Sequence, residues 1–146
     1  MHARTSSFLL CAAALWLAGC QTQPQTQAEA QPKPQVDPPC VVTQAVFANH
    51  IAPRHCAAVP PPGANQFVGA YCTLAGAQNF CTMVQNSPGR FRVVQVDGRI
   101  RYDANLNPAV VGTVGEMCGR MVMEPNGNVV TQFPELAGAP VPPACQ

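Results

Sequence analysis

Two histidines five positions apart are the side chains of this chain best suited to acid–base chemistry. His50 and His55 flank Arg54 in the segment Asn49-His50-Ile51-Ala52-Pro53-Arg54-His55. An imidazole titrates near neutral pH, so one histidine can take a proton while a second gives one. With an arginine to hold phosphate, such a pair suits metal-free cleavage of an RNA phosphodiester. The same spacing also fits a structural pair, with His50 in the core and His55 at the surface.

Metal binding is the weaker interpretation of these and neighbouring residues. One possible ligand set is His50, His55 and Cys56. It lacks a fourth ligand or a nearby carboxylate, and its thiol is better used in a disulfide. A second possible metal site is the segment that contains Met117, Cys118, Met121 and Met123, because thioether and thiolate groups are soft ligands that suit copper. Positions 121 and 123 recur at strand spacing, which favours a place in the core. We therefore expect neither a metal nor a cofactor.

Four arginines around a predicted hairpin form a second candidate surface. These arginines are Arg90, Arg92, Arg99 and Arg101. They project largely from one face and could together hold phosphate, nucleic acid or an acidic partner. Asp97 and Asp103 lie among them, so a solvated face with cross-strand Arg–Asp pairs is the alternative. No aromatic residue interleaves on that face to stack a base. We treat Arg92, Arg99 and Arg101 as candidate substrate-binding residues.

The N-terminus has the pattern of an export signal. Arg4 precedes an unbroken apolar run, Phe8 to Ala18, which is about half the roughly 20 residues needed to span a bilayer. The run ends in Leu17-Ala18-Gly19-Cys20, which resembles the lipobox of bacterial lipoproteins. The alternative is a plain signal peptide with an incidental cysteine.

The resemblance to lipoproteins implies a location. Residues 1–19 would be removed as a signal peptide, and Cys20 would carry lipid, palmitate included, as the new N-terminus. Buried acyl chains hold a protein at a membrane. Gln21 stands where an acidic residue would favour retention in the inner membrane. The resemblance therefore implies a cell-envelope protein, lipid-anchored in the outer membrane and facing the periplasm.

Charge and cysteine counts change once this signal is removed. Arg4 is one of eight basic residues, so its loss leaves seven basic against seven acidic side chains and a formally neutral chain. Six thiols remain beyond the lipidated one: Cys40, Cys56, Cys72, Cys81, Cys118 and Cys145. No pair has the Cys-x-x-Cys spacing of a zinc site. We expect up to three disulfides, whose pairing the sequence leaves open.

A tether precedes the folded domain. Residues 21–39 contain six Gln and five Pro, with Val36 the only large apolar side chain. Such a segment cannot bury enough surface to offset its ordering entropy. We therefore divide the chain into a signal peptide (1–19), a lipidated cysteine with its Gln/Pro-rich tether (20–39) and a domain (40–146). The tether could also be a recognition ligand, although the spacer interpretation is favoured.

The domain is predicted to begin with helices. Asp37 and Pro38 have the form of a helix start, and apolar residues then recur at helical spacing until Pro53, which predicts a helix over about 38–51. A second helical stretch covers about 66–85, although two glycines weaken it and could break it in two.

After residue 89 the apolar period changes from near four to two. Asp97-Gly98 predicts a two-residue hairpin turn with Val96 opposite Arg99. In that register, apolar and polar side chains lie on opposite faces: Phe91, Val93, Ile100 and Tyr102 on one, and Arg92, Arg99, Arg101 and Asp103 on the other. A second hairpin covers residues 118–124 and 128–133, and residues 108–115 between them are undecided. The fold class is α+β, with about four antiparallel strands after the helices.

Two motifs of this domain resemble a known group of nucleases. The segment 49–55 resembles the helix end of ribonuclease toxins in the barnase, EndoU, colicin and RelE-like superfamily, and residues 125–134 resemble their last hairpin. The order of helices and sheet also agrees over about residues 40–134. The resemblance implies catalytic roles for His50, His55 and Thr131, with Arg54 binding phosphate.

Two hypotheses on function follow. In the first, a membrane-anchored lipoprotein presents a disulfide-stapled domain that binds an envelope or periplasmic protein. In the second, the domain is a metal-independent endoribonuclease-like enzyme, and RNA is a partner only in that case. The first hypothesis is favoured, mainly on location, and the second is the alternative that the histidine motif supports.

Overall fold

The computed structural model describes residues 36–135 and 145. The helical elements are α1 (Gln44–Val46), a π-helical segment (Phe47–Ile51), α2 (Ala52–His55), a 3-10 turn (Gly69–Tyr71) and α3 (Leu74–Asn86). The strands are β1 (Phe91–Val94), β2 (Ile100–Asn105), β3 (Cys118–Met123) and β4 (Val129–Glu135). The predicted signal peptide (1–19), the predicted lipidation site Cys20 and the tether up to residue 35 lie outside the described residues. None of the described helices has the length and apolar character to cross a membrane.

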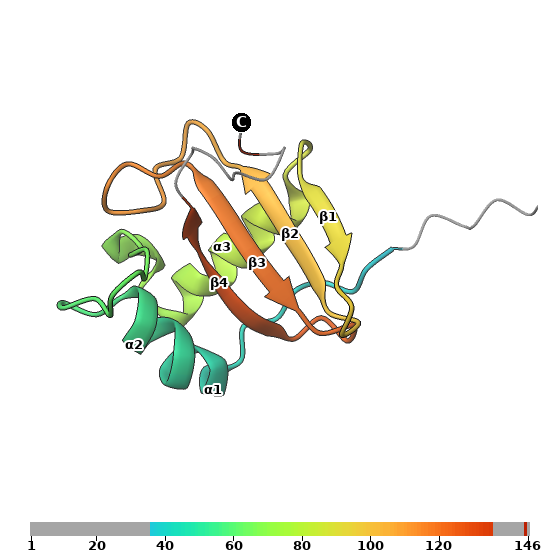
Figure 1. The fold of residues 1–146 in the computed structure, drawn as a ribbon, viewed down its shortest axis with the longest axis horizontal. Coiled ribbons are helices and arrows are strands. Elements are labelled where there is room, and N and C mark those ends of the chain that lie inside the picture. Colours follow the sequence, from blue (N-terminus) through green and yellow to red (C-terminus); the bar gives the residue numbers. More distant parts are fainter. Residues whose placement is uncertain (1–35, 136–144, 146) are drawn as a thin grey trace, which may run out of the picture. The chain divides into compact units, whose positions relative to one another are not determined.

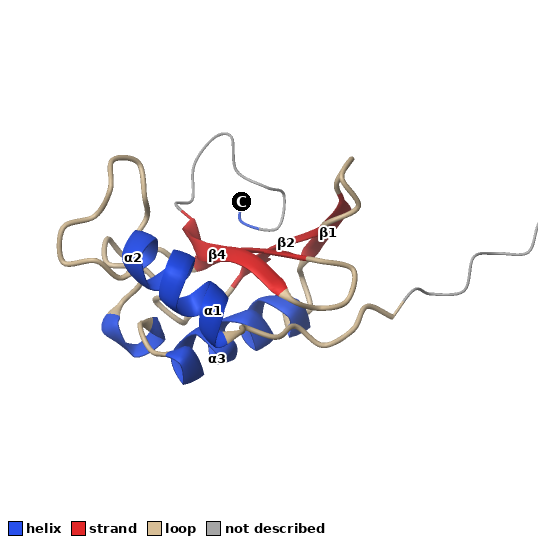
Figure 2. Cartoon of the chain, turned by 90° about the horizontal axis from the view of Figure 1, so that it is seen from below, coloured by secondary structure: helices blue, strands red, loops and turns tan. Residues whose placement is uncertain are grey.

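The four strands form one antiparallel sheet in the order β1-β2-β3-β4, so β1 and β4 are its edges (Figure 1). Figure 2 shows α3 against one face of the sheet. Alternate residues of the strands face this helix: Ile100, Tyr102, Ala104, Met121, Met123 and Val129. They make the core together with Phe80, Cys81 and Val84 of α3. The prediction of a few helices and a four-stranded antiparallel sheet is confirmed.

The first helix differs from the prediction at both ends. It begins at Gln44 rather than near Pro38, with Thr43 as its N-cap: the Thr43 Oγ1 atom accepts a 3.2 Å hydrogen bond from the Val46 amide. Asp37 does not cap a helix, because its carboxylate binds Arg92 and Tyr102 across the domain.

The helix also continues past Pro53 to His55, so the predicted stop is wrong. A proline usually ends a helix because it lacks an N–H and its ring meets the carbonyl four residues earlier. Here the residues before it form a π turn, in which the amide of Ala52 bonds to the carbonyl of Phe47, five residues back. That wider turn shifts the hydrogen-bond ladder and leaves room for the proline ring.

The second helical stretch is broken in two, as its glycines suggested. The 3-10 turn at Gly69–Tyr71 comes first, and α3 then begins after Thr73, whose hydroxyl accepts a 3.0 Å bond from the Gly76 amide. The break turns the chain so that the buried side of α3 meets the sheet.

The register of the first hairpin differs by one residue from the prediction. Gln95 pairs with Arg99 around a three-residue turn in which Gly98 has a φ of +85°. A type I turn followed by a left-handed glycine gives this loop length. A shift of one residue moves side chains to the other face. Phe91 and Val93 therefore lie opposite Asp103 and Arg101, on the face away from α3.

The second hairpin is confirmed, with a bulge near its turn. Met123 pairs with Val129 and Val122 pairs with Thr131, so Val130 is an extra residue in β4. A bulge bends its strand and changes the direction of nearby side chains. In this chain the bulge lies directly before Thr131.

Three disulfides staple the domain, as expected. They join Cys40 to Cys81, Cys56 to Cys72 and Cys118 to Cys145, with Cα–Cα distances of 6.2, 5.5 and 5.7 Å. All six predicted cysteines are thereby used. The first bridge links the start of the domain to the middle of α3, and the second links the end of α2 to the turn before α3.

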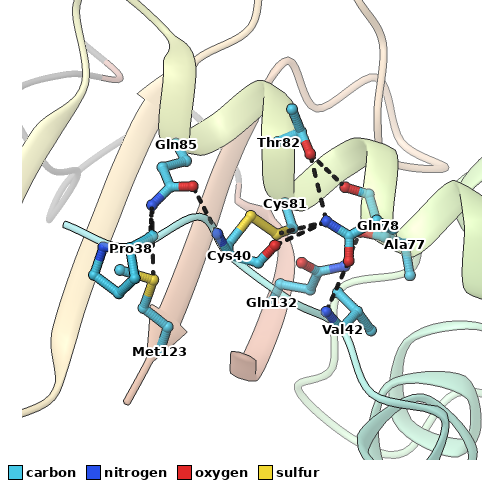
Figure 3. Close-up of a disulfide and its surroundings, with 10 residues drawn as sticks. All are labelled: Pro38, Cys40, Val42, Ala77, Gln78, Cys81, Thr82, Gln85, Met123 and Gln132. Atoms are coloured by element: carbon cyan, nitrogen blue, oxygen red, sulfur yellow. Dashed lines mark hydrogen bonds between the residues drawn. A yellow bond between two sulfur atoms is a disulfide. The ribbon is translucent and has the colours of Figure 1, made fainter. Parts of the chain in front are cut away.

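The segment 37–42 is held between α3 and β4 although it is not part of the sheet. Two glutamine amides on α3 each make two hydrogen bonds to its backbone, at 2.8–2.9 Å (Figure 3). On its other side, Val41 bonds to the carbonyl of Gly127 and to the amide of Val129, each at 2.9 Å. Residues 37–39, which are predicted to belong to the tether, therefore contact the domain.

Candidate active-site cleft

The helix of residues 44–55 and the edge strand β4 bring both histidines to one place. In a regular α-helix, residues five apart lie about 140° apart around the axis. The helix is not regular here, because the π-helical segment Phe47–Ile51 contains His50 and ends just after it, and the two ring centroids are 6.0 Å apart. On β4, Gln132 points toward α3 and bonds to the Ala77 carbonyl, so Thr131 and Phe133 on either side point the other way.

Thr131 contacts the first histidine directly. The Nε2 atom of His50 lies 2.9 Å from the Thr131 hydroxyl oxygen. These residues are 81 positions apart in the sequence, so the contact depends on packing of the helix along β4. The π turn and the β-bulge both lie beside this contact, and irregularities of both kinds are frequent at functional sites.

His55 is held on two sides and is only 3% exposed. Its Nδ1 atom lies 2.8 Å from the backbone carbonyl of Asn65, which can only accept a hydrogen bond. Nδ1 therefore carries the proton, and Nε2 of the neutral ring has a free lone pair. Within the described residues, this Nε2 atom has no hydrogen-bond partner. The ring also stacks on Phe133, at a centroid distance of 5.4 Å and an interplanar angle of 19°.

These groups border an open cleft of about 390 Å³. Its lining comes from the helix, from the loop after it and from β4: His50, Arg54, His55, Gly63, Ala64, Asn65, Val130, Thr131 and Phe133. This lining contains one arginine and two histidines but no carboxylate. Such a site favours an anionic ligand.

Burial keeps both histidines neutral. Desolvation lowers the pKa of His50 below its usual 6.5, and the positive charge of Arg54 acts in the same direction. Desolvation also lowers the pKa of His55, and the nearby His50 and Arg54 add to the effect, while the bond to Asn65 opposes it. Near neutral pH, both rings are therefore available to accept a proton.

This burial predicts that the domain loses stability in mild acid. In the unfolded chain each histidine takes up a proton below pH 6.5, whereas in the folded chain it does so at lower pH. The stabilisation is fully present above pH 6.5 and is lost as the pH falls through the lowered pKa values. Urea unfolding at pH 7.5 and 5.5 should show a lower unfolding free energy at pH 5.5. The loss should be smaller in His55→Gln, and an equal loss in both proteins would contradict the burial argument.

The three hairpin arginines do not join this cleft. Arg92 makes two hydrogen bonds, of 2.5 and 2.7 Å, to Asp37. Arg99 pairs with Asp97 and Glu124 at 3.6 and 3.0 Å, and Arg101 lies 2.9 Å from Asp103. None of the three is among the residues that border the cleft. The structure instead matches the alternative of arginines paired with carboxylates.

Two contributors to the cleft were not singled out from the sequence. Phe133 stacks on His55, and Arg120 lies over the Phe133 ring at 5.9 Å while its guanidinium binds Asp103 and Glu135. Asn65 contacts both His55 and β4. The alternation of β4 would place Phe133 beside Thr131, but no sequence signal marks Asn65.

The residues considered as metal ligands are used in other ways. Cys56 is bonded to Cys72, and Met121 and Met123 are fully buried in the core. Within residues 36–135 and 145, no three His, Cys, Asp or Glu side chains gather as a metal site would require.

Comparisons with known proteins assign no family. A scan of the chain against protein-family models gives no match. Searches of curated proteins and of solved structures also give none. A function can therefore be argued only from the chemistry of this cleft and from the sequence motifs.

Proposed function

We propose that this domain cleaves RNA without a metal, using the two histidines of the cleft. The observation that carries the proposal is the meeting of His50, His55 and Thr131, from two distant parts of the chain, at one open cleft. The resemblance of residues 49–55 and 125–134 to ribonuclease toxins supports the same activity. The cationic lining supports a phosphodiester as the substrate.

The two histidines differ in what they can do. His55 has an unprotonated Nε2, so it is the general base that removes the proton of the 2′-OH. The 2′ oxygen then forms a bond to phosphorus while the bond from phosphorus to the 5′ oxygen breaks. His50 is the general acid that protonates this leaving oxygen. A bound phosphodiester would raise the pKa of His50, because a nearby negative charge favours imidazolium.

Two groups would hold the phosphate during this reaction. Arg54 lines the cleft, and its guanidinium can bind two phosphate oxygens. Thr131 is already within hydrogen-bond distance of His50, so its hydroxyl can orient that ring or donate to the phosphate. The product expected from this sequence of bonds is a 2′,3′-cyclic phosphate and a free 5′-OH.

The experiment that tests the proposal is RNA cleavage in EDTA. The purified oxidised protein is incubated with a single-stranded RNA and with a matched strand that has one 2′-deoxy position. We expect cyclic-phosphate products from the RNA and no cleavage at the deoxy position. An absence of cleavage by the wild-type protein would contradict the proposal and leave the hypothesis of a domain that binds an envelope protein.

A matched pair of arginine variants tests the role of the cleft. Arg54→Ala removes the cationic side chain of the cleft and should lower kcat/KM for RNA by about tenfold. Arg99→Ala removes an arginine that pairs with Asp97 and Glu124 outside the cleft and should leave kcat/KM within about twofold. Similar losses in both variants would show that general charge, rather than the cleft, determines the rate.

We also propose that the domain is lipid-anchored in the outer membrane and faces the periplasm. The motif around Cys20 and the Gln at position 21 support this location. Cys20→Ala should move the protein from the membrane fraction to the soluble fraction or block its processing. Metabolic labelling with a palmitate analogue should mark the wild type only. Unchanged labelling of the variant would contradict lipidation at this residue.

A further inference from the structure

Asn65 makes two contacts that together join three parts of the cleft. It lies in the loop after α2, where its backbone carbonyl accepts the hydrogen bond from His55 Nδ1. Its side-chain Nδ2 donates a 2.8 Å bond to the carbonyl of Pro134, on β4. Asn65 is itself among the residues that line the cleft. One residue therefore ties the loop to the edge strand and to the buried histidine.

The other contacts of His55 fix its ring plane but not its proton. Phe133 stacks on the ring, and Phe67 meets it edge-on at 6.3 Å. Neither aromatic ring distinguishes the two imidazole nitrogens. Among the described residues, the Asn65 carbonyl is the only hydrogen-bond partner of this imidazole. A carbonyl at Nδ1 places the proton there and leaves the lone pair on Nε2.

We propose that Asn65 is a positioning residue that sets the tautomer of His55 through its side-chain bond to β4. The inference deepens the proposed function, on which the role of His55 as a base rests. The carbonyl belongs to the main chain, so every residue at position 65 supplies it. The side-chain amide of Asn65 holds this carbonyl against β4. On the other side, the Gln66 side chain and the Phe67 amide bond to the carbonyls of Arg54 and His55, which keeps the following residues on the helix. Loss of that bond releases residue 65 from β4, while Gln66 and Phe67 stay bonded to the helix. The carbonyl of residue 65 can then shift away from Nδ1, and His55 takes the Nε2–H form that free histidine prefers.

The test is the tautomer of His55 in the folded oxidised protein. Two-bond proton–nitrogen correlation spectra at pH 8 distinguish a protonated imidazole nitrogen from an unprotonated one. In the wild type, the proton should be on Nδ1. In Asn65→Ala it should move largely to Nε2, and in the matched control Asn79→Ala, an exposed amide on α3, it should remain on Nδ1.

A second variant guards against a folding defect. Asn65→Asp keeps the size of the side chain, but its carboxylate cannot donate to the Pro134 carbonyl. It should give the same change of tautomer as Asn65→Ala. The proposal is overturned if wild-type His55 carries its proton on Nε2, or if both Asn65 variants keep the wild-type tautomer.

The readout separates this inference from the nuclease proposal, because it needs no substrate. If the wild type cleaves RNA, Asn65→Ala should lower kcat by about tenfold or more with KM little changed, because Nε2 then carries a proton and cannot accept one. A changed tautomer with normal cleavage would overturn the positioning role but not the nuclease. A wild type that cleaves nothing would overturn the proposed function, while the spectra would still decide what Asn65 does to His55.

Discussion

His55→Gln should lower the rate of RNA cleavage by about 100-fold or more, which is the usual contribution of a general base. His55 borders the cleft, its buried Nε2 atom has no hydrogen-bond partner within the described residues, and glutamine cannot take up a proton there. His50→Gln should have an effect of similar size, because it removes the proposed acid. Single-turnover cleavage of an RNA with one scissile site measures both rates.

Binding controls separate a chemical effect from a structural one. Each variant should bind a non-cleavable 2′-deoxy strand within a few-fold of the wild type, as measured by fluorescence anisotropy. Their circular dichroism spectra should match the wild-type spectrum. Variants that keep full cleavage would show that the histidines are not the acid and base, and variants that lose binding as well would point to a collapsed cleft.

Removal of the bridge between Cys40 and Cys81 should cause the largest loss of stability. The two cysteines are 41 positions apart in the sequence. On the chain-entropy argument, the double variant Cys40→Ala/Cys81→Ala should lower the unfolding free energy by about 4 kcal/mol. Both cysteines are buried in the core, so their replacement also removes packed side-chain atoms. Urea unfolding of the purified proteins at pH 7.5 measures the difference in unfolding free energy.

The bridge between Cys56 and Cys72 is the matched control. Its sequence separation is 16, which corresponds to about 3 kcal/mol on the same entropy argument. The first double variant should therefore be the less stable of the two. Removal of a native disulfide usually lowers the unfolding free energy by more than about 1 kcal/mol. A smaller loss for Cys40→Ala/Cys81→Ala would contradict the expectation.

The sheet was predictable from its local signals, but the hairpin register was not. Asp97-Gly98 correctly marks a turn, and alternation correctly marks the strands around it. The same two residues fit a two-residue turn or the last two positions of a three-residue turn. Ile100 and Tyr102 face α3 in either register, so the choice lies with β1. The observed register pairs Arg92 with Tyr102, and both side chains bind Asp37 from the segment before the first helix. A long-range contact therefore decides a local detail.

The candidate site was predictable in its residues and not in its geometry. The motif and the family resemblance pointed to His50, His55, Arg54 and Thr131, and the structure brings these four to one cleft. The rule that proline ends a helix misplaced its boundary, because a π turn depends on the packing of the whole segment. Asn65 acts through its main-chain carbonyl, which has no signature in the sequence.

The hydrogen bonds that hold the segment 37–42 between α3 and β4 have a mechanical consequence. A pull on the N-terminal side of Cys40 reaches the domain as shear along that segment, so several hydrogen bonds to α3 and β4 resist together rather than in succession. The bond from Cys40 to Cys81 then passes the load into α3. The helix that carries both histidines follows Cys40 in the chain and stays outside this load path. A pull on the N-terminal side therefore loads β4, which carries Thr131, but not the helix that carries the two histidines.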